Sequence, residues 1–392
     1  MNDFTLYQPT YYVFGKNTQS KVGELVKRFG GTKVLIHYGG GSVVRSGLLQ
    51  QVQDSLNKAG IPYVQLGGVQ PNPRSGLVYE GIELCRKEGI DFVLGIGGGS
   101  AIDSGKAISV GVPYDGDFWD FYSAKVVPTQ ALKHGCVLTL PATGTEGSNS
   151  AVVTHEDGMI KRGLSTDFNR PVFSILNPEL TYTLPEFQTT CGIVDMMAHI
   201  LERYFTNTTD VDLTDRMAEG ALKAIIKAGP IAVKEPENYE ARATLMWAGT
   251  VAHNGSLGVG RQEDWGSHNM QHELSALYDV AHGAGLSVVF PNWMRFVVDK
   301  HISRFAQYAV RVWNCEMDFE NPRFTALEGI ERTSQFFKSL NMPLTFEEIG
   351  AKKEDIPLMT QKARADAEGL LGNFERLTKE DISTIYHMCC RQ

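Results

Sequence analysis

The sequence predicts two parts: an α/β dinucleotide-binding domain of the Rossmann type over residues 1–181 and an all-helical domain over residues 182–392. Short β-rich runs alternate with helical patterns in the first part, and long amphipathic segments fill the second. A chain of 392 residues is also longer than one ordinary core requires. The alternation predicts right-handed βαβ units and a parallel sheet that is covered on both faces.

The individual elements follow from hydrophobic periodicity. Apolar runs predict strands at 33–38, 62–66, 92–96 and 136–140, and helical patterns predict crossovers at 43–59, 75–88 and 101–110. A β-hairpin is predicted from 151–154 and 159–161, because the intervening Glu156-Asp157-Gly158 favours a tight turn. Amphipathic helices are expected in the second part at 187–205, 213–228, 238–255, 283–299 and 323–339.

Composition excludes several classes of partner. The formal net charge is −8 and no basic run occurs, which argues against nucleic acid and anionic membranes. No run of about 18 apolar residues is present, and the first residues lack the pattern of a signal peptide. The six cysteines lack metal-knuckle spacing and are expected to be reduced thiols. We therefore expect a soluble, cytoplasmic protein.

Two glycine-rich turns follow predicted strands. Gly97, Gly98, Gly99 and Ser100 separate a strand from a helix, where the backbone could approach a phosphate and the helix N-terminus would attract it. The turn lacks the G-x-G-x-x-G pattern, so a simple tight turn is the alternative.

The earlier turn consists of Gly39, Gly40, Gly41 and Ser42, with Arg45 just beyond it. An acidic residue at such a position commonly accepts the ribose 2′-hydroxyl of NAD(H), and none stands here. The turn therefore favours NADP(H) over NAD(H).

A third loop, residues 140–150, is rich in hydroxyl groups. Thr143 and Thr145 could bond a phosphate or the nicotinamide carboxamide. Side-chain to backbone bonds that stabilise the turn itself are an equal alternative.

The second part carries a candidate metal site. Asp195 and His199 are spaced i, i+4, which aims both side chains at one point from a helix, and His268, His272 and His282 follow within a short span. Mixed carboxylate and imidazole donors suit Fe²⁺, Zn²⁺, Co²⁺ or Ni²⁺ better than Mg²⁺ or Ca²⁺. The Asp195–His199 pair alone is more often a helix-capping or core pair joined by a hydrogen bond, and it is the three later histidines that favour the metal site. Because His268 and His272 are also spaced i, i+4, spacing does not decide which of them binds metal.

In chain order, these motifs resemble the iron-dependent (group III) alcohol dehydrogenase family. The matching motifs span nearly the whole chain: Tyr12–Lys16, Pro71–Pro73, Gly97–Lys106, Thr143–Thr145, Leu184–Pro185, Asp195 with His199, and His268–Gly283. Gly39–Ser42 and Asp264–Trp265 are most similar to the NADPH-dependent butanol dehydrogenase and broad aldehyde reductase branch. Two departures are Asn177-Pro178, where Asp-Pro is usual, and the loop tail Glu146–Ser150.

The resemblance implies a dehydroquinate synthase-like fold and assigns residues to roles. Asp195, His199, His268 and His282 would bind one Fe²⁺ or Zn²⁺, and His272 would orient substrate or pass a proton. The residues implied as cofactor contacts are Asp103, Thr143, Thr145 and Lys161, with Asn72 lining the nucleotide cleft.

The implied reaction is hydride transfer between NADP(H) and small aliphatic aldehydes or primary alcohols. The resemblance also implies at least a homodimer, joined through a strand near Tyr11–Phe14. Two other classes are a metal- and NAD-dependent lyase or synthase of the dehydroquinate synthase type and a non-catalytic binding protein. The lyase would need arginines and lysines for an anionic substrate, and no cluster of them is evident beside the metal motifs.

Overall fold

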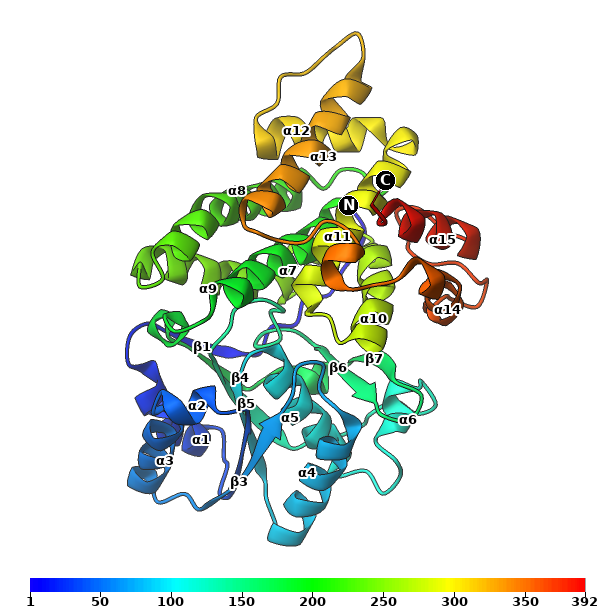
Figure 1. The fold of residues 1–392 in the computed structure, drawn as a ribbon. Coiled ribbons are helices and arrows are strands. Elements are labelled where there is room, and N and C mark those ends of the chain that lie inside the picture. Colours follow the sequence, from blue (N-terminus) through cyan, green and yellow to red (C-terminus); the bar gives the residue numbers. More distant parts are fainter. Residues whose placement is uncertain (392) are drawn as a thin grey trace. The chain divides into compact units, whose positions relative to one another are not determined.

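The computed structural model describes residues 1–391, which form two compact units (Figure 1). The α/β unit comprises residues 7–184 and 236–254. Within the described residues, the helical unit comprises residues 1–6, 185–235 and 255–391. The sequence prediction that two independent domains meet between residues 181 and 182 stays a prediction.

A six-stranded, fully parallel sheet forms the centre of the α/β unit, in the order β1-β8-β5-β4-β2-β3. Its strands are β1 (Tyr11–Phe14), β2 (Val34–Gly39), β3 (Tyr63–Val69), β4 (Phe92–Gly97), β5 (Lys133–Leu138) and β8 (Phe173–Leu176). Every residue of β4 is buried, as expected for a central strand that is covered on both faces. The predicted parallel α/β architecture is confirmed.

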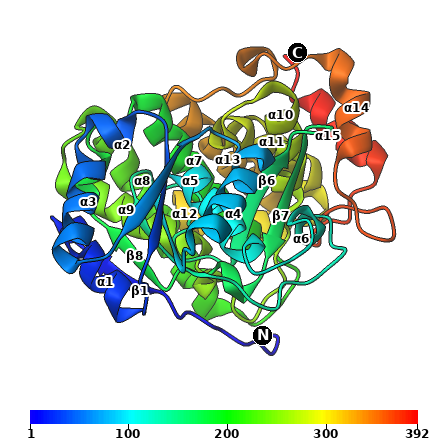
Figure 2. The same cartoon turned by 90° about the horizontal axis from the view of Figure 1, so that it is seen from below.

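Helices cover both faces of this sheet. Apolar residues of α1 (Val22–Arg28) and α3 (Leu48–Ala59) pack on one face, and those of α4 (Ser75–Glu88) and α5 (Gly99–Gly111) pack on the other. Figure 2 shows α3 and α4 on opposite sides of the strands. A short helix, α6 (Trp119–Tyr122), adds aromatic rings to the second face.

Several boundaries differ from the sequence prediction. The predicted helix 43–59 is divided into α2 (Ser42–Arg45) and α3, because Gly47 between them takes a φ of 76°. Strand β5 begins three residues earlier than predicted, and β8 was not predicted. The hairpin is confirmed as β6 (Ser150–His155) paired with β7 (Ile160–Ser165).

The remaining long elements of the described chain are helices. Those of the helical unit are α7 (Glu186–Tyr204), α8 (Asp212–Lys234), α10 (Gly266–Tyr278), α11 (His282–Val297), α12 (Ile302–Trp313), α13 (Pro322–Ser339), α14 (Ile356–Lys362) and α15 (Lys379–Met388). One later helix, α9 (Tyr239–His253), groups with the α/β unit instead. Across residues 1–391, no helix combines the length and the apolar character that crossing a membrane requires.

Candidate metal centre and nucleotide-binding turns

Helix α7 supplies two of the predicted metal ligands. It starts after Pro185, carries Glu186 in its first turn, and is buried almost continuously from Thr189 to Tyr204. Asp195 and His199 lie one turn apart on it, and both side chains are buried. The helical spacing read from the sequence therefore places both on one side of a buried helix.

Two further histidines approach Asp195 from neighbouring helices. Asp195 Oδ1 lies 3.6 Å from His282 Nε2 and 4.0 Å from His268 Nε2. His282 begins α11, and His268 lies in the first turn of α10. One ligand atom from each of Asp195, His268 and His282 falls within 4.8 Å of the other two.

His199 stands beside this trio. Its Nδ1 is 3.2 Å from Asp195 Oδ1, and its ring centroid is 4.6 Å from that of His268. Burial, with His268 and Arg203 nearby, lowers the pKa of His199 well below its usual value. The imidazole is therefore neutral near pH 7, which is the form that binds a metal.

The donor set fits a divalent ion of the first transition series. Ligands bound at ~2 Å around a tetrahedral ion stand about 3.3 Å apart. The distances from Asp195 Oδ1, 3.6 Å to His282 Nε2 and 4.0 Å to His268 Nε2, are about 0.3 and 0.7 Å longer, so a contraction of less than 1 Å brings these atoms to bonding separations. One carboxylate with several imidazoles is a donor set that suits Fe²⁺, Zn²⁺, Co²⁺ or Ni²⁺.

Trp265 forms an aromatic wall next to these ligands. Its ring meets those of His268 and His199 edge to face, with centroids 5.1 and 5.9 Å apart. The guanidinium of Arg203 lies over the indole at 4.7 Å, and the indole nitrogen donates to Glu263 at 2.7 Å. Arg203 on the ring face and Glu263 at the indole nitrogen thus hold Trp265 beside two candidate ligands.

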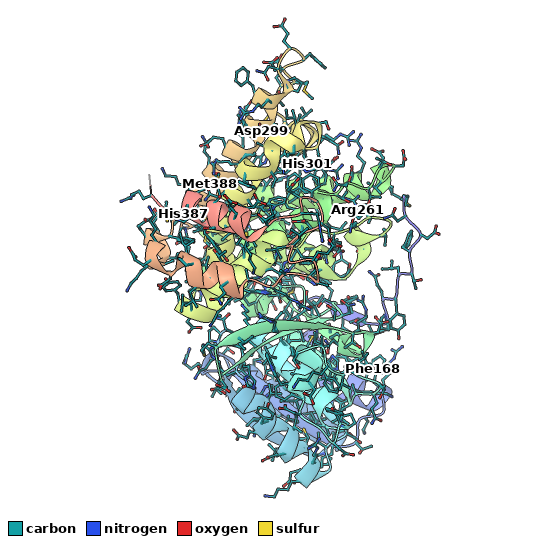
Figure 3. All side chains as sticks on the ribbon, turned by 90° about the vertical axis from the view of Figure 1, so that its right-hand side faces the viewer. Phe168, Arg261, Asp299, His301, His387 and Met388 are labelled. Atoms are coloured by element: carbon teal, nitrogen blue, oxygen red, sulfur yellow. The ribbon has the colours of Figure 1, made fainter. Side chains whose placement is uncertain are left out.

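His272, predicted as a catalytic residue, is half-buried on α10. Its ring centroid is 5.6 Å from that of His282. Other histidines of the same unit are engaged elsewhere: His301 stacks on Phe374 at 3.9 Å, and His387 is exposed on α15 (Figure 3).

In the α/β unit, the turn Gly97–Ser100 joins β4 to α5. Gly98 is the N-cap of α5 and Gly99 its first residue. A Cβ on Gly99 would lie 2.7 Å from Thr143 Oγ1. Glycine at this position therefore allows Thr143, a predicted cofactor contact, to lie against the N-terminus of α5, where anions are favoured.

Buried polar residues of α5 hold the loop around Thr145. Asp103 accepts from the Thr145 hydroxyl and, at 2.9 Å, from the backbone N–H of Val152. Lys106 is also fully buried, and its Nζ donates to the backbone carbonyls of Thr145 (2.6 Å), Ser148 (3.2 Å) and Ser150 (2.8 Å). Sequence reasoning did not identify this role of Lys106.

The remaining predicted nucleotide contacts form two groups. Lys161 on β7 donates to Asn72 Oδ1 at 2.9 Å, so these two predicted residues meet. Gly39 ends β2, and Gly40, Gly41 and Ser42 form an exposed turn into α2. The guanidinium of Arg45 folds back against Gly41, which adds positive charge to this turn.

Comparisons with known proteins agree with these features. Residues 9–178 match the family described as iron-containing alcohol dehydrogenase, and residues 189–390 match the C-terminal part of the Fe-containing alcohol dehydrogenase family. The chain is 43% identical over 386 residues to a probable NADH-dependent butanol dehydrogenase 2 of Bacillus subtilis, covering 98% of this chain and 99% of that protein. It is 37% identical over 390 residues to the NADPH-dependent aldehyde reductase YqhD of Escherichia coli, with the same coverage.

A solved structure gives the same result. The crystal structure of NADH-dependent butanol dehydrogenase A from Thermotoga maritima superposes with a TM-score of 0.96 at 39% identity, covering 100% of this chain and 99% of that one. The chain therefore belongs to the iron-containing alcohol dehydrogenase family, whose reaction class is the oxidoreduction of alcohols and aldehydes.

Proposed function

We propose that this protein transfers a hydride between NADP(H) and small aliphatic aldehydes or primary alcohols, with the help of one divalent metal ion. The observation that carries the proposal is the convergence of Asp195 Oδ1 with the Nε2 atoms of His268 and His282 in the helical unit. Family membership supplies the reaction class.

The proposed ligands are Asp195, His199, His268 and His282, holding Fe²⁺ or Zn²⁺. When bound, such an ion is a Lewis acid that polarises a carbonyl group and lowers the pKa of an alcohol. Asp195 contributes negative charge, and the neutral ring of His199 contributes a lone pair. His272, half-buried beside His282, is proposed to orient the substrate or to exchange a proton with its oxygen.

For the cofactor, we propose the two glycine turns and the loop that contains Thr143 and Thr145. The turn Gly97–Ser100 with the N-terminus of α5 would receive the pyrophosphate, and Asp103, Lys161 and Asn72 would shape the surrounding surface. The exposed turn Gly39–Ser42, with no acidic residue and with Arg45 beside it, favours the 2′-phosphate of NADP(H). Relatives named for NADH and for NADPH both occur, so cofactor preference must be measured on this chain.

We also propose a cytoplasmic homodimer. All six cysteines, at 85, 136, 191, 315, 389 and 390, are free thiols, as is usual in a reducing compartment. Strand β1 lies at the edge of the sheet, and Tyr11 and Phe14 on it are exposed. An uncovered edge strand can pair with a second copy.

The test is reduction of butanal by anaerobically purified protein that has been stripped of metal and reloaded with Fe²⁺ or Zn²⁺. We expect metal-dependent oxidation of the reduced nicotinamide, faster with NADPH than with NADH, and butanol as product. A substrate converted without net oxidation of the cofactor would instead favour the lyase class. Bound metal without turnover of any aldehyde or alcohol would contradict the proposed reaction.

A further inference from the structure

The Nδ1 atoms of two proposed metal ligands are each held by a buried acceptor side chain. We infer that Glu202 and Gln271 are positioning residues: they fix His268 and His282 in the tautomer that presents Nε2 to the metal. The inference rests on the proposed metal function and goes beyond the ligands themselves.

Glu202 is fully buried on α7, one turn after His199. Its Oε1 accepts from the Ser267 hydroxyl (2.6 Å), from the backbone N–H of His268 (3.1 Å) and from His268 Nδ1 (2.7 Å). Its Oε2 accepts from the backbone N–H of Trp265 at 2.7 Å. An ionised carboxylate has only acceptors, and four donors converge on this one.

The contact with Glu202 determines the tautomer of His268. Because a carboxylate oxygen only accepts, His268 Nδ1 carries the hydrogen, and the lone pair of the neutral ring resides on Nε2. That Nε2 lies 4.0 Å from Asp195 Oδ1, on the side where the other ligand atoms gather. The same carboxylate binds the backbone at the start of α10, so it fixes both the position of His268 along the helix and the direction of its ring.

For His282, a chain of hydrogen bonds leads to the same result. The Ser275 hydroxyl donates its one hydrogen to the backbone carbonyl of Val280 at 2.9 Å. It must therefore accept from Gln271 Nε2, which lies 2.7 Å away. This orients Gln271 with Oε1 toward His282 Nδ1, which donates to it. His282 Nε2 then carries the lone pair and lies 3.6 Å from Asp195 Oδ1.

The packing leaves room for this arrangement. A Cβ on Gly285, in the first turn of α11, would lie 2.5 Å from Gln271 Nε2. Glycine at that position therefore allows the amide to lie against α11 next to His282.

The two acceptors, Glu202 and Gln271, differ in charge. A carboxylate partner increases the basicity of an imidazole ligand more than an amide does. We therefore expect removal of Glu202 to weaken metal binding more than removal of Gln271.

The experiment measures the affinity of stripped protein for Co²⁺ by competition with a chromophoric chelator, together with the visible absorption of the bound ion. In Glu202→Gln the side chain keeps its shape, but an NH₂ group replaces one of the two carboxylate oxygens. That group must then face either the backbone N–H of Trp265 or the donors of Ser267 and His268, and a donor facing a donor forms no hydrogen bond. Affinity should fall by about 10- to 100-fold, the usual range for supporting residues of a metal site, and the spectrum should change. Gln271→Leu should lose about tenfold, whereas Gln271→Glu, which keeps an acceptor, should bind at least as tightly as wild type.

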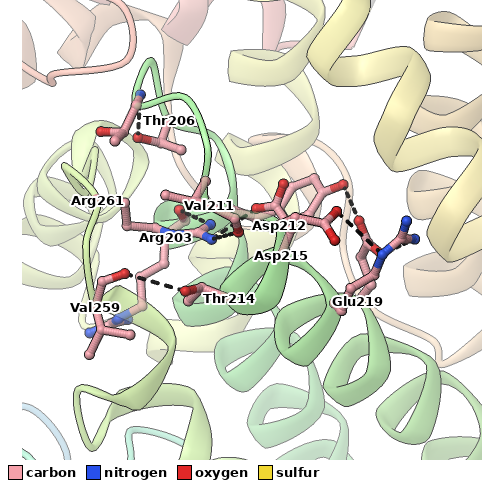
Figure 4. Close-up of polar contacts among 12 residues, drawn as sticks. Arg203, Thr206, Val211, Asp212, Thr214, Asp215, Glu219, Val259 and Arg261 are labelled. Carbon is pink, nitrogen blue, oxygen red and sulfur yellow. Dashed lines mark hydrogen bonds and ion pairs between the residues drawn. The ribbon is translucent and has the colours of Figure 1, made fainter. Parts of the chain in front are cut away.

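Glu219→Gln is the matched control. Glu219 is also buried in the helical unit, but it accepts from the Tyr204 hydroxyl at 2.9 Å and pairs with Arg311, within an ion-pair cluster that includes Asp215 and Arg261 (Figure 4). It should bind Co²⁺ as wild type does, with the same spectrum.

Three outcomes would overturn the inference. Wild-type affinity and spectrum in Glu202→Gln would show that the carboxylate does not position His268, and an equal loss in Glu219→Gln would assign the effect to general destabilisation. If Gln271→Glu lost as much Co²⁺ affinity as Gln271→Leu, an acceptor at position 271 would not be what orients His282. If wild type itself bound no Co²⁺, the metal site of the proposed function would fail, a result distinct from the other three.

Discussion

Gly39→Asp tests the proposed cofactor preference. The structure accommodates the change: a Cβ at Gly39 would lie 3.5 Å from the Val69 carbonyl oxygen, an ordinary contact, and the backbone is outside the left-handed region. A carboxylate about 6 Å from a dianionic 2′-phosphate would repel it by about 1.4 kcal/mol at the dielectric constant of water, and by about 3 kcal/mol at half that value. The preference for NADPH over NADH should therefore fall about 10- to 100-fold.

The assay compares kcat/KM for NADPH and NADH with butanal as the common substrate. Gly39→Asn has nearly the same shape as Gly39→Asp but no charge, and it should change the ratio much less. An unchanged ratio in Gly39→Asp would refute the argument that an acid-free turn selects NADP(H). An equal shift in both variants would attribute the effect to shape and remove charge as its cause.

Three further predictions concern the metal, the loop and pH. His282→Ala should lose bound metal, measured as ions per chain, together with activity; a fully metallated, active variant would contradict the ligand assignment. Lys106→Met should leave three buried carbonyls without their donor, lowering stability by about 3 kcal/mol and raising KM for NADPH; unchanged melting and KM would refute the role in the loop. Burial lowers the pKa of His37 from 6.5 to about 4, so the native ring stays neutral while the unfolded ring takes up a proton. The neutral ring therefore contributes its full share to the free energy of unfolding above pH 6.5, and that free energy falls by about 3 kcal/mol as the pH drops to 4. Between these pH values, denaturant unfolding of His37→Asn should show a correspondingly smaller loss of stability than wild type.

Strands could be predicted from the sequence where a local run of apolar residues is enough to specify a strand. The runs at 34–37 and 92–97 are buried throughout, so their apolar composition identifies these strands. Strand β8 has only four residues, Phe173–Leu176, and it is defined by pairing with β1 and β5, which are distant in sequence. The assignment of α9 to the α/β unit likewise depends on tertiary packing, which periodicity does not report.

The candidate metal centre was only partly readable from spacing. The i, i+4 rule brings Asp195 and His199 together because both lie on one helix. The same rule applies equally to His268 and His272. In the structure, His268 Nε2 lies 4.0 Å from Asp195 Oδ1, whereas His272 lies beside His282. That difference comes from how α10 packs against α7 and α11, so no local pattern contains it.

The supporting residues show where sequence reasoning could be extended. Asp195, His199 and Glu202 are spaced i, i+4, i+7 and form a polar stripe along a helix whose other inner positions, such as Ile200 and Leu201, are apolar and fully buried. Buried polar groups need partners, so a stripe of this kind within an apolar helical pattern predicts a polar centre from the sequence alone. Which member binds metal and which orients a ligand depends on the donors that meet each oxygen. For Glu202 these come from residues 265–268, more than 60 positions away, and only the folded chain brings them together.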